Sequence, residues 1–153
     1  MRRKEKEIKD FEEINSILKT ARICRLAMID GDRPYLIPMN FGYRENILYF
    51  HCARQGRKVE ILKKNPLVCF EIEWDISLLE GKEPCQWSMS FRSLIGSGKA
   101  EFIESPEQKV EALSIIMSQY SSQEKFSYPT EAVEGVTIFR VSIDEICGKQ
   151  SGI

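Results

Sequence analysis

The sequence has a single histidine, His51, and no closely spaced pair of cysteines. A site that needs two imidazoles from one chain is therefore excluded. The five cysteines are Cys24, Cys52, Cys69, Cys85 and Cys147. They contain no CxxC pair of the kind that indicates a zinc ribbon or a thioredoxin-like centre. We therefore expect no metal site, and we interpret the cysteines as free thiols that pack as small hydrophobic side chains.

The sequence also lacks an excess of charge of one sign and a long hydrophobic run. Lys and Arg number 22 against 23 Asp and Glu, for a formal net charge of -1, so bulk electrostatics favour neither nucleic acid nor a membrane surface. The first ten residues, MRRKEKEIKD, are charged throughout, which argues against a secretory signal. No later run is long enough to span a membrane. We expect one cytoplasmic domain over residues 1–153, a length that can bury a single core.

Short apolar runs separated by turn residues dominate most of the chain. The predicted strands cover Ile23–Ile29, Pro34–Tyr43, Ile47–Cys52, Leu67–Trp74, Met89–Ile103 and Val136–Ile143. The first three follow one another through tight turns, which indicates an antiparallel meander. Gly96 and Gly98 mark a bulge in the fifth strand. Helices are predicted over Asp10–Ala21, Gly56–Lys64 and from Ser105 to about Tyr120. Six strands with peripheral helices favour a mainly β barrel, because closing a sheet protects its edges.

The clearest local signal for chemistry is the segment from His51 to Lys58, HCARQGRK. It leaves a strand, passes Gly56 and enters a helix, so Arg57 and Lys58 fall in the first helical turn. Cations there oppose the helix dipole at a cost of up to about 1 kcal/mol. That cost is understandable if an anion lies over the free backbone N–H groups and between both side chains. The alternative is a solvated basic helix end that holds no ligand.

Other nucleotide motifs are incomplete. The tetrapeptide GSGK at residues 96–99 resembles the end of a phosphate-binding loop, but Ser93 stands where that loop needs glycine and Ala100 where it needs Ser or Thr. His51 has two interpretations: it could hydrogen-bond a cofactor or a substrate carboxylate, or it could be a satisfied histidine at the barrel rim.

Two weaker constellations lie further along the chain. Arg92 and Ser93 could add a cation and a hydroxyl near the same site, although an outward-facing strand charge is the commoner role for such an arginine. Trp74 and Trp87 could cover a flat ring, although core packing is the commoner role for either.

Several segments, taken in their order and spacing, resemble a known family. They are Arg22–Ala27, Tyr35–Tyr43, Leu48–Ala53 with Gly56–Lys58, Asn65–Glu71, Phe91–Glu101 and Cys147–Lys149. The chain resembles the FMN-binding split barrels of the pyridoxamine 5'-phosphate oxidase-like superfamily, and within it the 5-nitroimidazole resistance (Nim-type) proteins. The resemblance covers nearly the whole chain. It implies a six-stranded antiparallel split β-barrel that works as a homodimer, with FMN in grooves between the subunits.

The resemblance also implies which residues hold the flavin. The strand Pro38, Met39, Asn40 and Phe41 would run along the isoalloxazine edge, mostly through backbone groups. His51, Cys52 and Ala53 would approach the ring and the ribityl chain, with His51 on the substrate side as the candidate catalytic residue. Arg57 and Lys58 would hold the phosphate. Arg92 and Ser93 would come from the fifth strand, from the same subunit or across the dimer interface.

The activity that the resemblance implies is a flavin-dependent reductase acting on a small molecule, with nitroaromatic compounds such as 5-nitroimidazoles as candidate substrates. FMN would supply the redox chemistry. Three alternatives stay open. A pyridoxamine-phosphate oxidase would need a basic pocket for a second phosphate, which the sequence does not show. A flavin-binding protein without catalytic activity is the second alternative, and a haem-binding barrel with His51 as axial ligand is the third.

Overall fold

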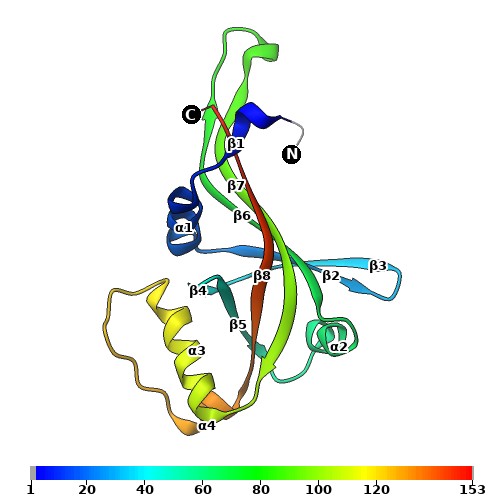
Figure 1. Ribbon diagram of the computed structural model, residues 1–153, viewed down its shortest axis with the longest axis vertical. Helices are drawn as coiled ribbons and strands as arrows, with labels where there is room; N and C mark the ends of the chain where they lie inside the picture. Colours follow the sequence, from blue (N-terminus) through cyan, green and yellow to red (C-terminus); the bar gives the residue numbers. More distant parts are fainter. Residues whose placement is uncertain (1–2, 153) are drawn as a thin grey trace.

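Three long strands form the spine of the molecule (Figure 1). They are β6 (Leu67–Leu79), β7 (Ser88–Ile103) and β8 (Val136–Ser151), and β7 pairs antiparallel with both of the others. The structure is a computed structural model that describes residues 3–152. The apolar residues of these strands alternate with polar ones over most of their length, so one face of the sheet can be buried while the other stays exposed.

The other strands extend this sheet on both sides. β2 (Cys24–Asp30) and β3 (Arg33–Met39) form a hairpin beside β6, while β4 (Gly42–Arg44) and β5 (Ile47–Ala53) form a second hairpin beside β8. The strand order is β3-β2-β6-β7-β8-β5-β4, with β1 (Glu7–Ile8) paired to β8. The predicted mainly β, antiparallel fold is confirmed. The sheet curls without closing, and β3 remains an edge strand.

Over residues 3–152 the structure has eight strands, where the sequence predicts six. One addition is the two-residue strand β1; the other arises because the predicted strand Pro34–Tyr43 is divided into β3 and β4. The division falls at Phe41, whose side chain is fully buried and whose backbone N–H donates to the Tyr120 hydroxyl at 2.9 Å. That backbone group is therefore not available to a neighbouring strand.

Helices pack around the sheet at the predicted places. They are α1 (Phe11–Thr20), α2 (Arg57–Lys64), α3 (Pro106–Ser118) and a short α4 (Thr130–Glu134), with 3-10 turns η1 (Lys4–Lys6) and η2 (Pro84–Gln86). The side chain of Asp10 accepts a hydrogen bond from the Glu12 N–H, and Ser105 caps α3 in the same way. These caps are the signals that predict the starts of α1 and α3. The sequence did not predict α4.

The core lies between the curled sheet and α1 and α2. Its largest buried side chains are Phe41, Phe50, Phe70 and Phe139, and the rings of Phe50 and Phe139 stack with centroids 5.1 Å apart. A second cluster of buried residues lies under α3. Because side chains alternate along β5, Phe50 and Cys52 face the core while His51 and Ala53 are exposed.

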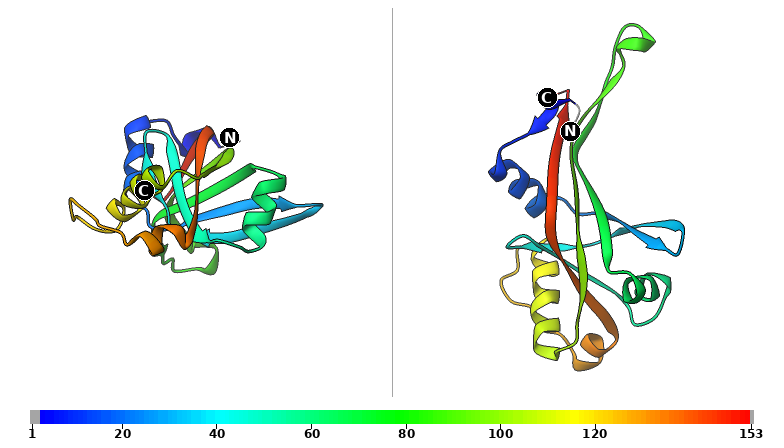
Figure 2. Two further views of the ribbon diagram at one scale, coloured as in Figure 1. Left: turned by 90° about the horizontal axis from the view of Figure 1, so that it is seen from below. Right: turned by 45° about the vertical axis from the view of Figure 1, so that its right-hand side comes forward.

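β6 and β7 continue beyond the body of the molecule as a two-stranded arm, at the top of Figure 1 and the upper right of Figure 2. A register shift between Trp74 and Ser77 marks its root, where Asp75 has a φ of 56°. Trp74 and Trp87 are 38% and 47% exposed. Core packing is therefore the wrong interpretation of both tryptophans.

Two further expectations can be compared with the structure. The predicted bulge is confirmed by a register shift between Ser97 and Gly98. The cysteines are all free, but only two of them are buried. The interpretation as packed hydrophobic groups is therefore correct for Cys24 and Cys52 and wrong for Cys69, Cys85 and Cys147.

Within residues 3–152, no helix has the length and apolar character needed to cross a membrane.

Candidate functional site

The predicted anion-binding segment lies where α2 meets the hairpin of β2 and β3, on the right of Figure 1. α2 begins only three residues after β5 ends, and it packs against β2. Its buried residues Val59, Ile61 and Leu62 hold it on the core. The first turn of α2 is therefore fixed beside the tip of the hairpin and the end of β5.

Arg57 is fixed by two contacts with the hairpin. Its Nε donates to Asp30 Oδ2 at 2.9 Å, and its guanidinium carbon lies 4.6 Å from the centroid of the Tyr35 ring. The side chain is 56% exposed. A guanidinium carries five N–H donors, and within the described part of the chain only the one on Nε has a partner. Four directed donors therefore remain for a ligand.

The start of α2 offers further donors. Its N-cap residue is Gly56, whose φ of 146° favours glycine, and no side chain of residues 3–152 caps this end. The first intrahelical bonds are donated by the Val59 and Glu60 N–H groups, both to the Gly56 carbonyl. The N–H groups of Arg57 and Lys58 lack such partners. Together with the two side chains they can bind a phosphate.

His51 and Cys52 lie within the electrostatic reach of Lys58. The His51 side chain faces outward, but its ring is partly shielded from solvent; this desolvation lowers its pKa below the ordinary value, and the positive charge of Lys58 lowers it further. The imidazole is therefore neutral at pH 7. Burial raises the pKa of the Cys52 thiol, and Lys58 only partly opposes that shift, so Cys52 is protonated and is a poor nucleophile. Within residues 3–152 the His51 ring makes no hydrogen bond, which leaves both of its nitrogens available.

The strand predicted to line the isoalloxazine alternates between exposed and buried residues. Pro38 and Asn40 are exposed, while Met39 and Phe41 belong to the core. Among the strands of the described residues, β3 pairs with β2 alone, so the backbone groups on its other edge are available to a ligand. The Phe41 N–H is an exception because it donates to Tyr120. Any side-chain contact from this strand must therefore come from Pro38 or Asn40.

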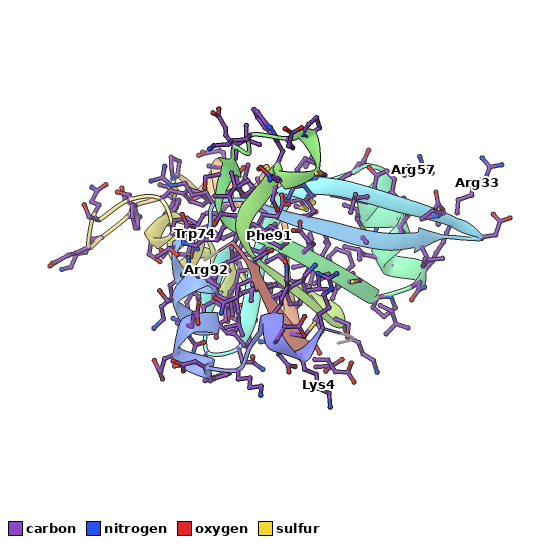
Figure 3. The ribbon with its side chains drawn as sticks, turned by 90° about the horizontal axis from the view of Figure 1, so that it is seen from above. Lys4, Arg33, Arg57, Trp74, Phe91 and Arg92 are labelled. Atoms are coloured by element: carbon purple, nitrogen blue, oxygen red, sulfur yellow. The ribbon has the colours of Figure 1, made fainter. Side chains whose placement is uncertain are left out.

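Arg92 and Ser93 are not next to Arg57 within one chain. Arg92 lies at the root of the arm, where its Nε donates to Glu13 at 2.9 Å and its Nη1 donates to Asp75 at 2.6 Å. Figure 3 shows Arg92 beside Trp74 and Phe91 and well separated from Arg57. Two carboxylates thus balance the charge of Arg92. A role for this pair at the flavin remains a prediction that requires a second subunit.

Sequence reasoning missed Asp30, Tyr35 and Tyr120. The Tyr120 hydroxyl donates to the Arg22 carbonyl at 2.7 Å and accepts from Phe41, which fixes the chain after β3. No local pattern distinguishes this tyrosine. The hairpin register pairs Asp30 with Arg33 and Met28 with Tyr35, but it does not relate either residue to the anion site. Their contact with Arg57 depends on the placement of α2, which the hairpin pattern does not contain.

Two open grooves lie on the outer face of the sheet, away from this site. The larger, about 600 Å³, follows the β7–β8 bulge and is lined by Cys69, Ile95, Ser97, Asp144 and Cys147 among others. The second, about 370 Å³, shares some of these residues and adds Ala27, Ile29, Pro34 and Leu67. Neither is lined by Arg57, Lys58 or His51. The apolar surface around these grooves is therefore a separate feature from the anion site.

Comparison with known proteins places the chain in a family. Residues 10–150 match the family model of pyridoxamine 5'-phosphate oxidase. A candidate 5-nitroimidazole antibiotic resistance protein from Bacteroides thetaiotaomicron VPI-5482 is 38% identical, with a TM-score of 0.84 over 94% of this chain and 86% of that one.

More distant structures share the fold. The flavocytochrome Anf3 from Azotobacter vinelandii is 20% identical, with a TM-score of 0.86 over 100% of this chain and 72% of that one. An FAD- and haem-binding protein from Mycobacterium smegmatis is 16% identical, with a TM-score of 0.86 over 97% of this chain and 74% of that one. An uncharacterized protein of Rhizobium meliloti (strain 1021) is 30% identical over 61 residues, so the match spans 40% of that relative's length. From the family-model match and the 38% identical structure, we conclude that this chain belongs to the pyridoxamine 5'-phosphate oxidase family.

Proposed function

We propose that this protein binds FMN and is an FMN-dependent reductase whose substrates include nitroaromatic compounds of the 5-nitroimidazole type. The observation that carries the proposal is the anion site formed by Arg57, Lys58 and the uncapped start of α2. A neutral His51 lies at the neighbouring strand end. The 38% identity to a candidate 5-nitroimidazole resistance protein supports the choice of substrate.

The residues present fit a flavin phosphate. A dianionic phosphate needs several charge-assisted donors, and Arg57 and Lys58 supply them from side chain and backbone together. Because FMN ends in a phosphate, it would use all of these donors at once. FMN, when bound, supplies the redox chemistry, since it accepts electrons as hydride or singly.

The other residues of the site orient the ring and manage protons. The exposed edge of β3 offers backbone groups along which a flat ring can lie, with Asn40 as the polar side chain of that segment. His51 is neutral at pH 7, so one ring nitrogen can donate a hydrogen bond to a bound substrate while the other accepts. We assign His51 the role of holding the substrate and passing a proton at its ring nitrogens.

Turnover of a nitroimidazole tests this function. With FMN and a chemical reductant, we expect the protein to consume a 5-nitroimidazole faster than the same concentration of free FMN. Replacing His51 with alanine should lower the rate about 100-fold, the usual contribution of a positioned acid–base group. The rates are compared with both proteins saturated with FMN, so that a change in flavin affinity does not contribute, and equal melting temperatures are the control for folding. A wild-type rate equal to that of free flavin would exclude the reductase.

We also propose that a second copy of this chain is its partner. Four large apolar side chains on the outer face of the sheet, Ile29, Leu36, Leu67 and Ile95, are each about half exposed. Leu36 lies on β3, Ile29 on β2, Leu67 on β6 and Ile95 on β7. These four strands are adjacent in the sheet, and the two grooves lie beside these residues. The arm adds exposed Trp74, Ile76, Leu78 and Trp87. Exposed apolar side chains gathered on adjacent strands are typical of an interface, and a symmetric dimer would cover them with the same surface of the partner.

Sedimentation at several concentrations tests the dimer. We expect dimers for the wild type and a roughly 100-fold weaker association for Ile95→Arg, because a charge would be buried at the centre of the interface. The matched control is Val110→Arg, since Val110 is an exposed apolar residue on α3. A monomeric wild type, or equal effects of the two substitutions, would reject this interface.

A further inference from the structure

The hairpin of β2 and β3 restrains Arg57 before any ligand arrives. An exposed arginine side chain normally samples many rotamers, and binding a phosphate costs it that freedom. Here Asp30 holds the Nε edge at 2.9 Å and the Tyr35 ring lies 4.6 Å from the guanidinium carbon. Two different contacts, one to an edge and one to a face, determine both the position and the plane of the guanidinium.

The geometry leaves the ligand-binding edge of Arg57 free. Asp30 contacts Nε, and the Nη1 and Nη2 donors have no partner within residues 3–152. A carboxylate or a phosphate can take two guanidinium donors at once, either at the Nη1–Nη2 edge or at the Nε edge. Asp30 contacts only Nε, so the Nη1–Nη2 edge keeps both of its donors for a ligand.

The groups that hold Arg57 both belong to the hairpin of β2 and β3. Tyr35 is partly buried, packs against the main core and pairs with Met28 across the hairpin. Asp30 pairs with Arg33 at the last rung, beside a turn in which Gly31 has a φ of 68°. Both positions are therefore set by the hairpin and not by α2, so Arg57 is held against a separate element.

We propose that Tyr35 and Asp30 are positioning residues that hold Arg57 ready for a terminal phosphate, so that this chain selects a phosphorylated flavin over riboflavin. The inference rests on the proposed function, and it names the residues that give the protein its preference for a phosphorylated flavin. Tyr35 acts through the face of its ring, and its hydroxyl has no part in the effect. Asp30 acts as a hydrogen-bond acceptor, and its negative charge opposes the phosphate.

Paired variants of Tyr35 test the proposal. Quenching of flavin fluorescence gives the Kd of the wild type for FMN and for riboflavin. We expect Tyr35→Leu to weaken FMN binding about 10-fold and to leave riboflavin binding unchanged, because riboflavin has no phosphate. Tyr35→Phe keeps the ring and should bind both flavins like the wild type. A Tyr35→Leu variant that retains the wild-type preference for FMN would overturn the inference.

A double substitution separates positioning from general damage to the fold. In an Arg57→Met background, Tyr35→Leu should have no further effect on the FMN Kd, since the side chain it positions is gone. An additional 10-fold loss in that background would show that Tyr35 acts on the fold or on the flavin directly, and would contradict the proposal. Melting temperatures of all variants provide the check on folding.

Two substitutions of Asp30 provide a second test, one that keeps a hydrogen-bond acceptor and one that removes it. Asp30→Asn keeps an acceptor for Nε and removes the charge, so we expect it to bind FMN at least as tightly as the wild type. Asp30→Ala removes both, and we expect weaker FMN binding than in Asp30→Asn. If Asp30→Ala binds FMN as tightly as Asp30→Asn or more tightly, an acceptor at residue 30 does not position Arg57 and the proposed role of Asp30 is wrong. A wild type that binds neither FMN nor riboflavin would overturn the proposed function together with this inference.

Discussion

Replacing Arg57 and Lys58 together with methionine is expected to weaken FMN binding about 100-fold, while riboflavin binding changes little. Each cation donates charge-assisted hydrogen bonds that are worth about 1.5–3 kcal/mol, and the two act on the same phosphate. Methionine keeps a long unbranched side chain and a high helix propensity, so α2 should remain intact. Titration of the protein with each flavin, followed by fluorescence, measures the effect.

The matched control lies at the other end of the same helix. Lys63→Met with Lys64→Met also removes two exposed cations from α2, but from its last turn. We expect this pair to retain nearly all of the wild-type affinity for FMN. Equal losses in the two double variants would mean that only the overall charge matters. Unchanged binding in the first would place the phosphate elsewhere.

Gly98→Ala is expected to lower the free energy of unfolding by about 3 kcal/mol or more, the range of a severely overpacked core position. A Cβ at residue 98 would lie 2.1 Å from the Ser142 carbonyl oxygen and 2.9 Å from Val141 Cγ1. The oxygen belongs to the backbone of β8, so it cannot move without disturbing the pairing of β7 with β8 at the bulge. Urea unfolding measures the change.

Gly31→Ala is the comparison for Gly98→Ala. Nothing lies within 4 Å of the Cβ that the change would add, but the φ of 68° disfavours any side chain, so a loss of about 1 kcal/mol is expected. The two variants therefore separate steric overlap from backbone strain. A Gly98→Ala variant as stable as Gly31→Ala would show that the two strands are not packed as described.

The elements that the sequence predicts well are those with local signals. Asp10 and Ser105 cap α1 and α3, and Gly98 marks the bulge, because capping and close approach depend on a few neighbouring residues. The break at Phe41 was missed because it depends on Tyr120, which is distant in sequence. The arm was missed because its apolar residues, such as Trp87, remain exposed within one chain.

The candidate site also contains residues with a local signal, which the sequence predicts, and residues without one, which it does not. The sequence predicts Arg57 and Lys58 as an anion site because both lie in one helical turn after Gly56. Asp30 and Tyr35 could not be predicted with them, since β2 and α2 are brought together by packing of the core. Arg92 was expected near the flavin, yet within one chain it is bound to Glu13 and Asp75. Its expected role depends on a partner subunit, which no single-chain pattern can describe.

The most direct test of the account is a visible absorption spectrum of the freshly purified protein, followed by denaturation and identification of the molecule that is released. We expect a yellow protein that releases about one FMN per chain. A colourless protein that takes up no added FMN would contradict it, as would release of FAD or a Soret band from bound haem.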